Sequence, residues 1–412
     1  MDLFEYKNNE LYCEDVPLAS IAQAIGTPCY VYSSTTFKQH LEDLEQAWEG
    51  TPHLTCYSVK VASNLALLKI VAARNLGADI VSGGELFRAL KAGIEPSKIV
   101  YSGVGKTASE MAEALEASIL MFNVESAAEL ELLAKIAADK NLTAPISLRV
   151  NPDVDPKTHP YVATGLKESK FGVPAAEALE LYSLASQTPS LRPVGLDCHI
   201  GSQLVSVEPF REAASILKDL ILRLRQSSIP ITFLDLGGGL GINYFQEKPP
   251  TPAQYAGALK EVLSGMPDLT VITEPGRVVA GNSAVLLTKV LYLKQTQAKS
   301  FVIIDGALND LIRPSLYGSY HAIGLVKSND GPLSPVDVVG PVCESGDFLA
   351  KDRPLPPVAA GEFLAVRSAG AYGFSMSSNY NSRPRAAEVL VSGNSFEVIR
   401  NRESYQDLIR GE

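Results

Sequence analysis

The chain has 412 residues, of which 46% are hydrophobic and 20% charged, a composition that predicts folded domains and excludes an intrinsically disordered protein. Its 36 lysines and arginines face 46 aspartates and glutamates, and because the two signs are mixed along the chain, it lacks the basic stripe of a nucleic-acid-binding protein. No apolar run approaches the roughly 18 residues of a membrane span, which argues against a membrane protein.

The start of the chain and its cysteines indicate the compartment. The first ten residues do not combine a basic segment with an apolar one, as a signal peptide would. The five cysteines, at positions 13, 29, 56, 198 and 343, form no CxxC pair, which excludes a cysteine zinc site and a disulfide framework. We therefore expect a cytoplasmic protein without a metal site. A plastid location stays compatible with the sequence if a transit peptide was removed before Met1.

Short apolar runs alternate with amphipathic stretches between residues 50 and 280. The apolar runs predict eight strands: Leu54–Val59, Ala78–Ser82, Ile99–Ser102, Ile119–Asn123, Ile146–Asn151, Gly195–His199, Phe233–Leu236 and Thr270–Thr273. The stretches between them predict helices: Ser63–Arg74, Gly84–Ala92, Ala108–Leu115, Ser126–Asp139, Ala175–Ala185, Pro209–Arg225 and Thr251–Leu263. Ser63, Thr107 and Thr251 are the expected N-caps. This alternation predicts a (β/α)8 TIM-like barrel, although a doubly wound sheet has the same periodicity.

From about residue 283 the pattern changes to strands with few helices. The expected strands are Val285–Leu293, Phe301–Asp305, Phe363–Ser368, Ala387–Val391 and Ser395–Arg400, with long loops at 306–322 and 340–349. Short strands at Leu11–Cys13 and Cys29–Tyr32 are assigned to the same domain, and prolines at 249–250 and 354–357 to surface turns. The expected parts are an N-terminal segment (1–35) packing with the β domain, a barrel (36–282) and a mainly-β C-terminal domain (283–412).

Polar residues cluster at the carboxyl ends of the predicted barrel strands, where barrels carry their active sites. They are Lys60, Asp79, Arg149, His199–Gln203, Gly237–Gly241 and Glu274–Arg277. The loops after strands 7 and 8 of a barrel often bind phosphate, and here they carry glycines and an arginine. Backbone N–H groups and a guanidinium suit a phosphate dianion, so this coincidence favours the barrel over the open sheet.

Taken singly, each of these residues has an ordinary structural explanation. Lys60 fits a solvated strand end, His199 a hydrogen-bonded core residue, and Glu274 a helix cap or surface charge. The glycines at 237–241 fit a simple turn, since they form no GxGxxG, and Cys343 fits a small buried apolar residue. Together, a lysine, a carboxylate, a histidine and a phosphate cradle on one barrel rim predict a pyridoxal-phosphate site.

Several motifs extend this pattern over essentially the whole chain. They are LYCED at 11–15, YSVK at 57–60, GADIVSGGE at 77–85, YSGVGKT at 101–107, TGLKESKFGV at 164–173, HIGSQ at 199–203, LGGGLG at 236–241, EPGR at 274–277, NDLIRPSLY at 309–317, GPVCESGD at 340–347 and GAYGFSMSSNYN at 370–381. With them, the sequence resembles the alanine-racemase-like (fold type III) pyridoxal-phosphate decarboxylases. It departs from the usual family pattern beside the lysine, at Ser58 and at Val61-Ala62, where we expect only local changes in packing or hydrogen bonding.

The resemblance implies pyridoxal 5'-phosphate as the cofactor and assigns residues to hold it. Lys60 would bind the cofactor covalently, Glu274 would keep its ring nitrogen protonated, and His199 would lie against one ring face. Asp79 and Arg149 match positions near the cofactor, with Arg149 bonding the ring hydroxyl. The phosphate would be bound by Ser202, Gly239, Gly276, Arg277 and Tyr372.

The resemblance also implies the activity, which is decarboxylation of meso-2,6-diaminopimelate to L-lysine and CO2, the last step of lysine biosynthesis. Arg277 and Arg313 would clamp the distal carboxylate of the substrate in bidentate fashion. Cys343 would donate a proton to the carbanion carbon, because a thiol is largely protonated at neutral pH. The other substrate contacts would be Tyr317, Glu344 and Tyr372. Enzymes of this kind are head-to-tail homodimers in which the loop carrying Cys343 completes the neighbour's site.

Three other functions compete with this interpretation. Ornithine or arginine decarboxylases share the barrel and cofactor motifs, but their substrates have no distal carboxylate, so Arg313 and Glu344 favour the diaminopimelate substrate. A cofactor-binding regulator without turnover is disfavoured because Lys60, Glu274 and Cys343 are all retained. A nicotinamide dehydrogenase would need GxGxxG after its first strand, and residues 59–66 contain none.

Overall fold

The computed structural model describes residues 2–155 and 170–412. The chain divides into two compact units, which we call the barrel unit (41–242 and 248–277) and the β unit (1–40, 243–247 and 278–412). Of the motif at 164–173, residues 164–169 lie outside the described residues.

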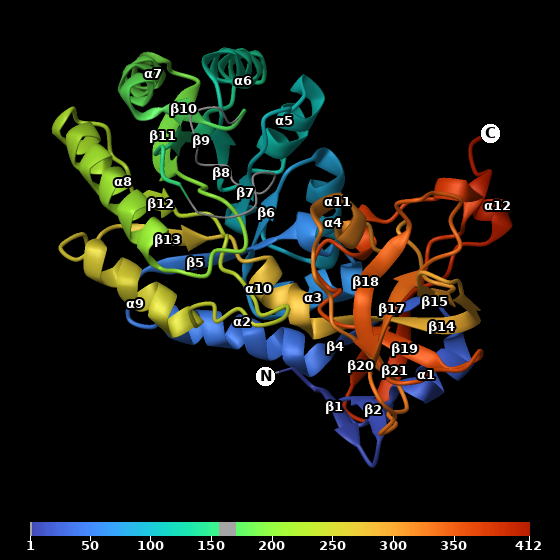
Figure 1. Ribbon diagram of the computed structural model, residues 1–412. Coiled ribbons are helices and arrows are strands. Elements are labelled where there is room, and N and C mark those ends of the chain that lie inside the picture. The colour runs from blue at the N-terminus through green and yellow to red at the C-terminus, as the bar shows by residue number, and fades with distance from the viewer. Residues whose placement is uncertain (1, 156–169) are drawn as a thin grey trace. The chain divides into compact units, whose positions relative to one another are not determined.

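Among the described residues, eight parallel strands close into a barrel in the barrel unit (Figure 1). They are β5 (His53–Ser58), β6 (Gly77–Ile80), β7 (Ile99–Tyr101), β8 (Met121–Val124), β9 (Ala144–Asn151), β11 (Leu191–Asp197), β12 (Phe233–Asp235) and β13 (Thr270–Thr273). Each pairs with the next, β13 pairs with β5, and the short β10 (Val173–Pro174) adds to β9. The (β/α)8 barrel is therefore confirmed, and the doubly wound alternative is wrong.

Helices alternate with these strands and lie outside them (Figure 1). They are α3 (Leu65–Ala73), α4 (Gly83–Ala92), α5 (Ala108–Glu116), α6 (Ala127–Asp139), α7 (Ala175–Gln187), α8 (Glu208–Gln226) and α9 (Pro252–Val262). Thr107 and Thr251 close capping boxes at α5 and α9, as expected, whereas Asn64 rather than Ser63 caps α3. The sequence thus located these barrel helices, with each predicted start within two residues of the observed one.

The barrel strands are covered on both faces, so most of their residues are apolar and buried. One cluster inside the barrel joins Cys56, Val100, Met121, Val194 and Ile272 from different strands. Against this apolar background several buried strand residues are polar, namely Asp79, Asn123, Ser147, Arg149, Asp197 and Asp235. Because a buried polar group is costly without a partner, these residues indicate a functional region in the barrel.

The β unit is built around a nine-stranded sheet. Its strands are β4 (Cys29–Ser33), β14 (Ala284–Gln295), β15 (Ser300–Ile304), β16 (Ile323–Leu325), β17 (Ser334–Val339), β18 (Phe348–Leu355), β19 (Phe363–Val366), β20 (Ala387–Ser392) and β21 (Ser395–Arg400). β4 lies between β14 and β20, so the N-terminal segment contributes a central strand, which confirms that part of the expected fold. A small sheet of β1 (Phe4–Lys7), β2 (Glu10–Cys13) and β3 (Val16–Pro17) precedes it.

Several elements were not expected from the sequence. These are the helices α1 (Leu18–Ile25), α2 (Ser34–Trp48), α10 (Arg277–Ala280), α11 (Arg313–Tyr317) and α12 (Tyr405–Leu408), and the strands β16, β17 and β18. α2 buries Phe37, Leu41, Leu44 and Trp48, a helical spacing that the alternating strand signals around it obscured. The turn expected at 354–357 is wrong in its first part, because Pro354 lies in β18, an edge strand of the sheet where a proline is tolerated.

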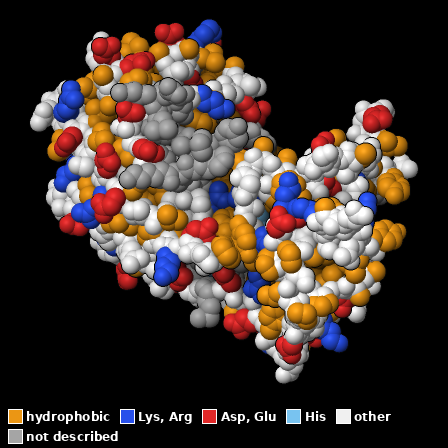
Figure 2. Space-filling model, viewed as in Figure 1, with side chains coloured by type: hydrophobic (Ala, Val, Ile, Leu, Met, Phe, Trp, Pro, Cys, Tyr) orange, Lys and Arg blue, Asp and Glu red, His pale blue; other side chains and the backbone are white. Residues whose placement is uncertain are grey.

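Charged side chains of both signs are interspersed over the visible face of the described residues (Figure 2). This surface agrees with the mixed charge pattern of the sequence. Of the helices that the structure describes, none combines the length and the apolar character needed to cross a bilayer.

The buried carboxylate of Glu14 joins the N-terminal segment to the C-terminal part of the β unit. Ser33 Oγ (2.7 Å) and Thr35 N–H (2.8 Å) donate to Oε1, while Thr35 Oγ1 (2.9 Å) and Gly393 N–H (2.6 Å) donate to Oε2. With four donors converging on it, the position requires an acceptor at both oxygens.

Replacing Glu14 by glutamine should therefore destabilise the protein by about 1.5–3 kcal/mol, because the amide NH2 would face donors where an oxygen is needed. The free energy of unfolding from urea titration measures this. Glu5→Gln, at an exposed position of β1, is the matched control and should change stability by less than about 0.5 kcal/mol. Equal stabilities of the two variants would contradict the role of Glu14.

Candidate active site

Lys60 follows strand β5 in a single 3-10 turn and forms an ion pair with Asp79. Its Nζ lies 2.6 Å from Oδ2 of Asp79, which is fully buried in β6. Ser58 Oγ lies 3.0 Å from the same oxygen and 3.0 Å from the backbone carbonyl of Glu274, and its single proton can be donated to either acceptor. Burial alone would raise the pKa of Asp79, but the Lys60 ammonium and the hydrogen bonds outweigh it, so the pKa is lowered. The lysine is therefore held at the strand end by a charged carboxylate.

His199 lies between two buried acids. Its Nε2 is 3.1 Å from Asp197 Oδ1 and 3.2 Å from Glu274 Oε2. Burial lowers the pKa of His199 to about 3, with the Arg149 charge adding to the effect, so the imidazole is neutral. Burial also raises the pKa of Asp197 to about 8 and of Asp235 to about 6, and that of Glu274 well above its usual value. Burial thus disfavours the charged form of each of these acids, and a cation placed beside them would favour ionisation.

The glycine-rich loop after β12 packs tightly against this cluster. A Cβ on Gly237, where φ is +61°, would lie 2.6 Å from His199 Nδ1, and one on Gly238 would lie 2.2 Å from the Glu274 carbonyl oxygen. A Cβ on Gly239 would lie 2.6 Å from the Gly201 carbonyl oxygen. These glycines are therefore required by close backbone packing, a reason that the sequence pattern did not reveal.

The loops after β11 and β13 meet through Arg277 and Ser202. Arg277 is buried, and its Nε and Nη2 donate to Ser202 Oγ at 3.2 and 2.9 Å. Gly276 beside it leaves no room for a side chain, since a Cβ there would lie 2.4 Å from Val61 Cγ2. A guanidinium and a hydroxyl held together at a glycine-lined loop are suitable donors for a phosphate.

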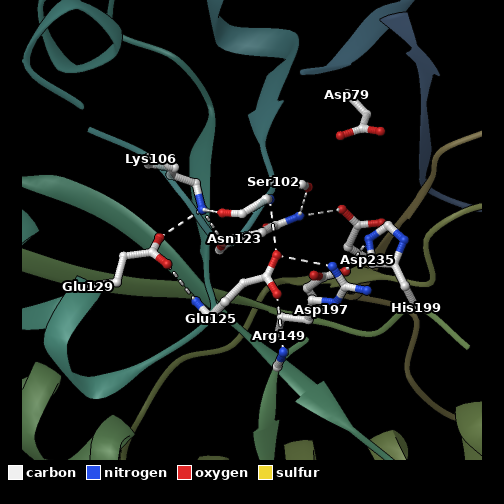
Figure 3. Close-up of polar contacts among 12 residues, drawn as sticks. Asp79, Ser102, Lys106, Asn123, Glu125, Glu129, Arg149, Asp197, His199 and Asp235 are labelled. Atoms are coloured by element: carbon white, nitrogen blue, oxygen red, sulfur yellow. Dashed lines mark hydrogen bonds and ion pairs between the residues drawn. The ribbon is translucent and has the colours of Figure 1, made fainter. Parts of the chain in front are cut away.

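Arg149, near the end of β9, is fixed by Glu125. Its Nη1 donates to Glu125 Oε1 at 3.0 Å, and its guanidinium carbon lies 4.5 Å from the centre of the Phe171 ring. Figure 3 shows this pair beside the Asp197–His199 group, with Asn123 connecting Ser102 to Asp235. Sequence reasoning missed Asn123, Glu125, Asp197 and Asp235, although an acid or amide inside an otherwise apolar strand was a usable signal.

The β unit contains the other sequence-predicted residues. Arg313 is buried at the start of α11, where its Nη2 donates to Ser319 Oγ at 3.2 Å. Its guanidinium carbon lies 5.5 Å from the ring centre of Tyr244 and 5.7 Å from that of Tyr317. Both rings are within the distance of a cation–π contact with the guanidinium.

Cys343 and Glu344 lie in a tethered loop between β17 and β18. Cys343 is exposed, and its backbone N–H donates to Asn381 Oδ1 at 2.8 Å. Asp347 closes the base of the loop by accepting from Val342 N–H at 2.7 Å. Tyr372, the remaining predicted residue, has a positive φ of 56°. The described residues thus group Lys60, Asp79, Arg149, His199, Ser202, Gly239, Glu274, Gly276 and Arg277 in the barrel unit, and Arg313, Tyr317, Cys343, Glu344 and Tyr372 in the β unit.

The barrel residues suit pyridoxal phosphate. Lys60 offers an amine, Arg277 and Ser202 offer phosphate donors, and a protonated ring nitrogen would supply the cation that the Glu274 carboxylate needs to ionise. One buried oxygen of Asp79, Oδ1, accepts no hydrogen bond from the described residues, so the carboxylate can accept one more donor.

Comparison with known proteins agrees with this site. Residues 34–281 match the family described as pyridoxal-dependent decarboxylase, pyridoxal binding domain. The chain therefore belongs to the pyridoxal-dependent decarboxylases, whose cofactor is pyridoxal phosphate. The resemblance seen in the sequence is confirmed.

Full-length relatives identify the branch of that class. The chain is 52% identical to diaminopimelate decarboxylase of Pseudomonas aeruginosa over 412 residues, covering 100% of this chain and 99% of the relative. It is 50% identical to the Haemophilus influenzae diaminopimelate decarboxylase over 409 residues, covering 99% and 98%. The crystal structure of Helicobacter pylori diaminopimelate decarboxylase complexed with L-lysine superimposes with a TM-score of 0.93 at 45% identity, covering 95% and 98%. Within the class, the chain belongs to the diaminopimelate decarboxylases.

The raised pKa of Asp197 predicts a pH-dependent effect on stability. Because the folded-state pKa of about 8 exceeds the unfolded value, the folded protein binds more protons than the unfolded chain, and Asp197 reduces stability progressively as pH rises from about 4 to 8. Asp197→Asn should therefore stabilise the cofactor-free protein relative to wild type at pH 8.5 more than at pH 5. Urea unfolding at the two pH values measures this difference.

Asp219→Asn is the matched control, since Asp219 is exposed on α8. Its effect on unfolding should be the same at both pH values. If the effect of Asp197→Asn is equally independent of pH, burial does not control this carboxyl.

Proposed function

We propose that this protein decarboxylates meso-2,6-diaminopimelate to L-lysine and CO2 with pyridoxal phosphate, the last step of lysine biosynthesis. The observation that carries the proposal is the set of Lys60, His199, Glu274 and Arg277 at the carboxyl ends of the barrel strands, in a chain about half identical to diaminopimelate decarboxylases over its full length. In the net reaction the carbon–carboxylate bond breaks, CO2 leaves, and a proton takes its place on the carbon.

The barrel residues bind and orient the cofactor in this proposal. Lys60 binds it covalently, Glu274 pairs with the ring nitrogen, and His199, neutral and backed by Gly237, packs against one ring face. Asp79 holds the Lys60 amine, and Arg149 bonds the ring hydroxyl. Ser202, Gly239, Gly276, Arg277 and Tyr372 bind the phosphate. When bound, pyridoxal phosphate accepts the electron pair left by the departing CO2.

The remaining predicted residues, most of them in the β unit, bind the substrate and return the proton. Arg313 and Arg277 clamp the distal carboxylate, Glu344 receives the distal ammonium, and Tyr317 and Tyr372 donate hydroxyl hydrogen bonds. The burial of Arg313 and the aromatic rings beside it support this role, because they hold in place a fork that binds carboxylates bidentately. Cys343, exposed on its tethered loop, protonates the carbon.

The proposal includes a cytoplasmic homodimer with two shared active sites. The five unpaired cysteines support a reducing compartment. The exposed position of Cys343 on a loop supports its use by a second copy of the chain.

The direct test is incubation of the purified protein and cofactor with meso-diaminopimelate, ornithine and arginine in separate reactions. Lysine and CO2 should form from diaminopimelate, with little CO2 from the other two substrates. Faster release from ornithine or arginine would reassign the substrate. No turnover of any of the three would identify a non-catalytic relative.

Lys60 should carry the cofactor. Borohydride reduction of the holoenzyme followed by peptide mapping should place the pyridoxyl group on Lys60, because its amine is the one paired with Asp79 at the strand end. Lys60→Ala should lose the visible absorbance of the bound cofactor. A label on Lys69 or Lys106 would refute the assignment.

Arg313 should set substrate use rather than cofactor binding. Arg313→Ala should leave the visible absorbance of the cofactor intact and reduce kcat/KM for diaminopimelate by an amount equivalent to about 1.5–3 kcal/mol, the value of a hydrogen bond to a charged group. Arg353→Ala is a matched control: Arg353 is also a buried arginine of the β unit stacked on a tyrosine, with 3.9 Å between its guanidinium carbon and the centre of the Tyr320 ring. An equal loss of kcat/KM in both variants would mean that Arg313 acts through packing and does not bind the substrate.

Mixing two inactive variants tests the shared site. Lys60→Ala and Cys343→Ala should each be inactive alone, since each change affects both sites of its homodimer. After subunit exchange half of the dimers are mixed, and one site in each mixed dimer receives neither change, so activity should recover to about a quarter of normal. No recovery, despite exchange shown by an independent label, would mean that Cys343 serves its own chain.

A further inference from the structure

Lys106 is a fully buried lysine that the proposed mechanism does not use. It follows β7 in the motif at 101–107, and its side chain has 0% exposure. Its Nζ donates to the carbonyl oxygens of Gly103 and Asn123, both at 2.8 Å, and to Glu129 Oε1 at 2.7 Å. All three ammonium protons therefore have acceptors, two from backbone and one from a carboxylate.

Glu129 connects Lys106 to Glu125 through its two carboxylate oxygens. Glu129 lies in the first turn of α6, and its second oxygen, Oε2, accepts from the backbone N–H of Glu125 at 3.1 Å. The Lys106 ammonium thus holds the carboxylate that fixes the backbone between β8 and α6. Figure 3 shows the contact between Lys106 and Glu129 and the contact between Glu129 and the backbone nitrogen of Glu125.

Glu125 in turn fixes Arg149. Oε1 of Glu125 accepts from Arg149 Nη1 and from Gly103 N–H, both at 3.0 Å, and Oε2 accepts from Gly172 N–H at 3.1 Å. Gly103 is contacted twice, by Lys106 at its carbonyl and by Glu125 at its N–H. The strand ends of β7, β8 and β9 are thereby joined by two cations, Lys106 and Arg149, with the two carboxylates of Glu129 and Glu125 between them.

We propose that Lys106 is a positioning residue for the cofactor, acting through Glu129 and Glu125 on the guanidinium of Arg149. This inference rests on the proposed function, which places Arg149 at the ring hydroxyl. Four charged side chains in a buried series carry a large desolvation cost, which their contacts with one another and with backbone groups offset. Loss of the Lys106 charge would release Glu129, then the backbone of Glu125, and so the orientation of Arg149.

The experiment removes the first pair of charges together, since Lys106→Met alone would leave a buried unpaired carboxylate and could prevent folding. The variants are Lys106→Met/Glu129→Gln, Arg149→Met and the triple variant that combines them. Cofactor dissociation constants, the wavelength of the visible absorbance of the bound cofactor and its pH dependence are measured in each. Lys140→Met is the control, because Lys140 and Glu116 form an exposed ion pair at the other end of α6.

The double variant Lys106→Met/Glu129→Gln should weaken cofactor binding about ten-fold or more, which is the usual effect of removing a residue that orients a ligand-binding group. It should also shift the visible absorbance in the same direction as Arg149→Met. In the Arg149→Met background the same pair should have little further effect, because the group it positions is already gone. Lys140→Met should leave both readouts unchanged. Lys106→Arg should restore much of the affinity, since it keeps the buried cation.

Two results would overturn the inference without touching the proposed function. One is a normal dissociation constant and spectrum for Lys106→Met/Glu129→Gln while Arg149→Met changes both. The other is an equal further loss in the Arg149→Met background, which would show that Lys106 acts independently of Arg149. If Arg149→Met itself leaves cofactor binding and absorbance unchanged, the assigned role of Arg149 is wrong and this inference is overturned with it. Failure to release lysine from diaminopimelate would refute only the proposed substrate.

Discussion

The burial of acidic side chains inside the barrel is the constraint on which the candidate site depends. Asp79, Asp197, Asp235 and Glu274 lie at or just beyond the carboxyl ends of four strands and are all buried. Carboxylates in such surroundings are costly unless they are paired, which is why the pKa values of three of them are raised and why the fourth keeps its charge beside Lys60. A site with this excess of acids favours cationic ligands, and a protonated pyridine ring is one.

Much of the fold followed from the sequence because the barrel repeats one local pattern. Each of the eight strands was found within a few residues, since short apolar runs bounded by polar residues recur at regular spacing. β17 and β18 were missed because Pro335 and Pro354 argue against strands, yet these two residues face each other across the edge of the sheet. The position of β4 between β14 and β20 involves pairing across more than 250 residues, which no local pattern specifies.

The predicted site residues shared a different signal. Lys60, His199, Glu274 and Arg277 follow strands, where a parallel barrel exposes side chains at one rim, so their position alone suggested chemistry. Asp197 and Asp235 fall inside the strands predicted from the sequence and were absorbed into the apolar pattern, although both are within the cluster around His199. Lys106 and Glu125 were missed for another reason, because their importance comes from partners brought together by three separate strand ends.

The glycine-rich loop shows how one motif can satisfy two requirements at once. The sequence suggested that Gly237–Gly241 binds phosphate, whereas the structure shows that Gly237 and Gly238 are needed because His199 and the backbone of Glu274 pack directly on them. These requirements do not compete: glycine packing sets the positions of the histidine and the glutamate, and a turn without side chains also suits the binding of an anion. Because the loop, the histidine and the glutamate are in direct contact, a side chain at either glycine would displace the ring-binding groups together with the phosphate loop. The groups proposed to hold the two ends of the cofactor are therefore mechanically coupled through a few backbone contacts.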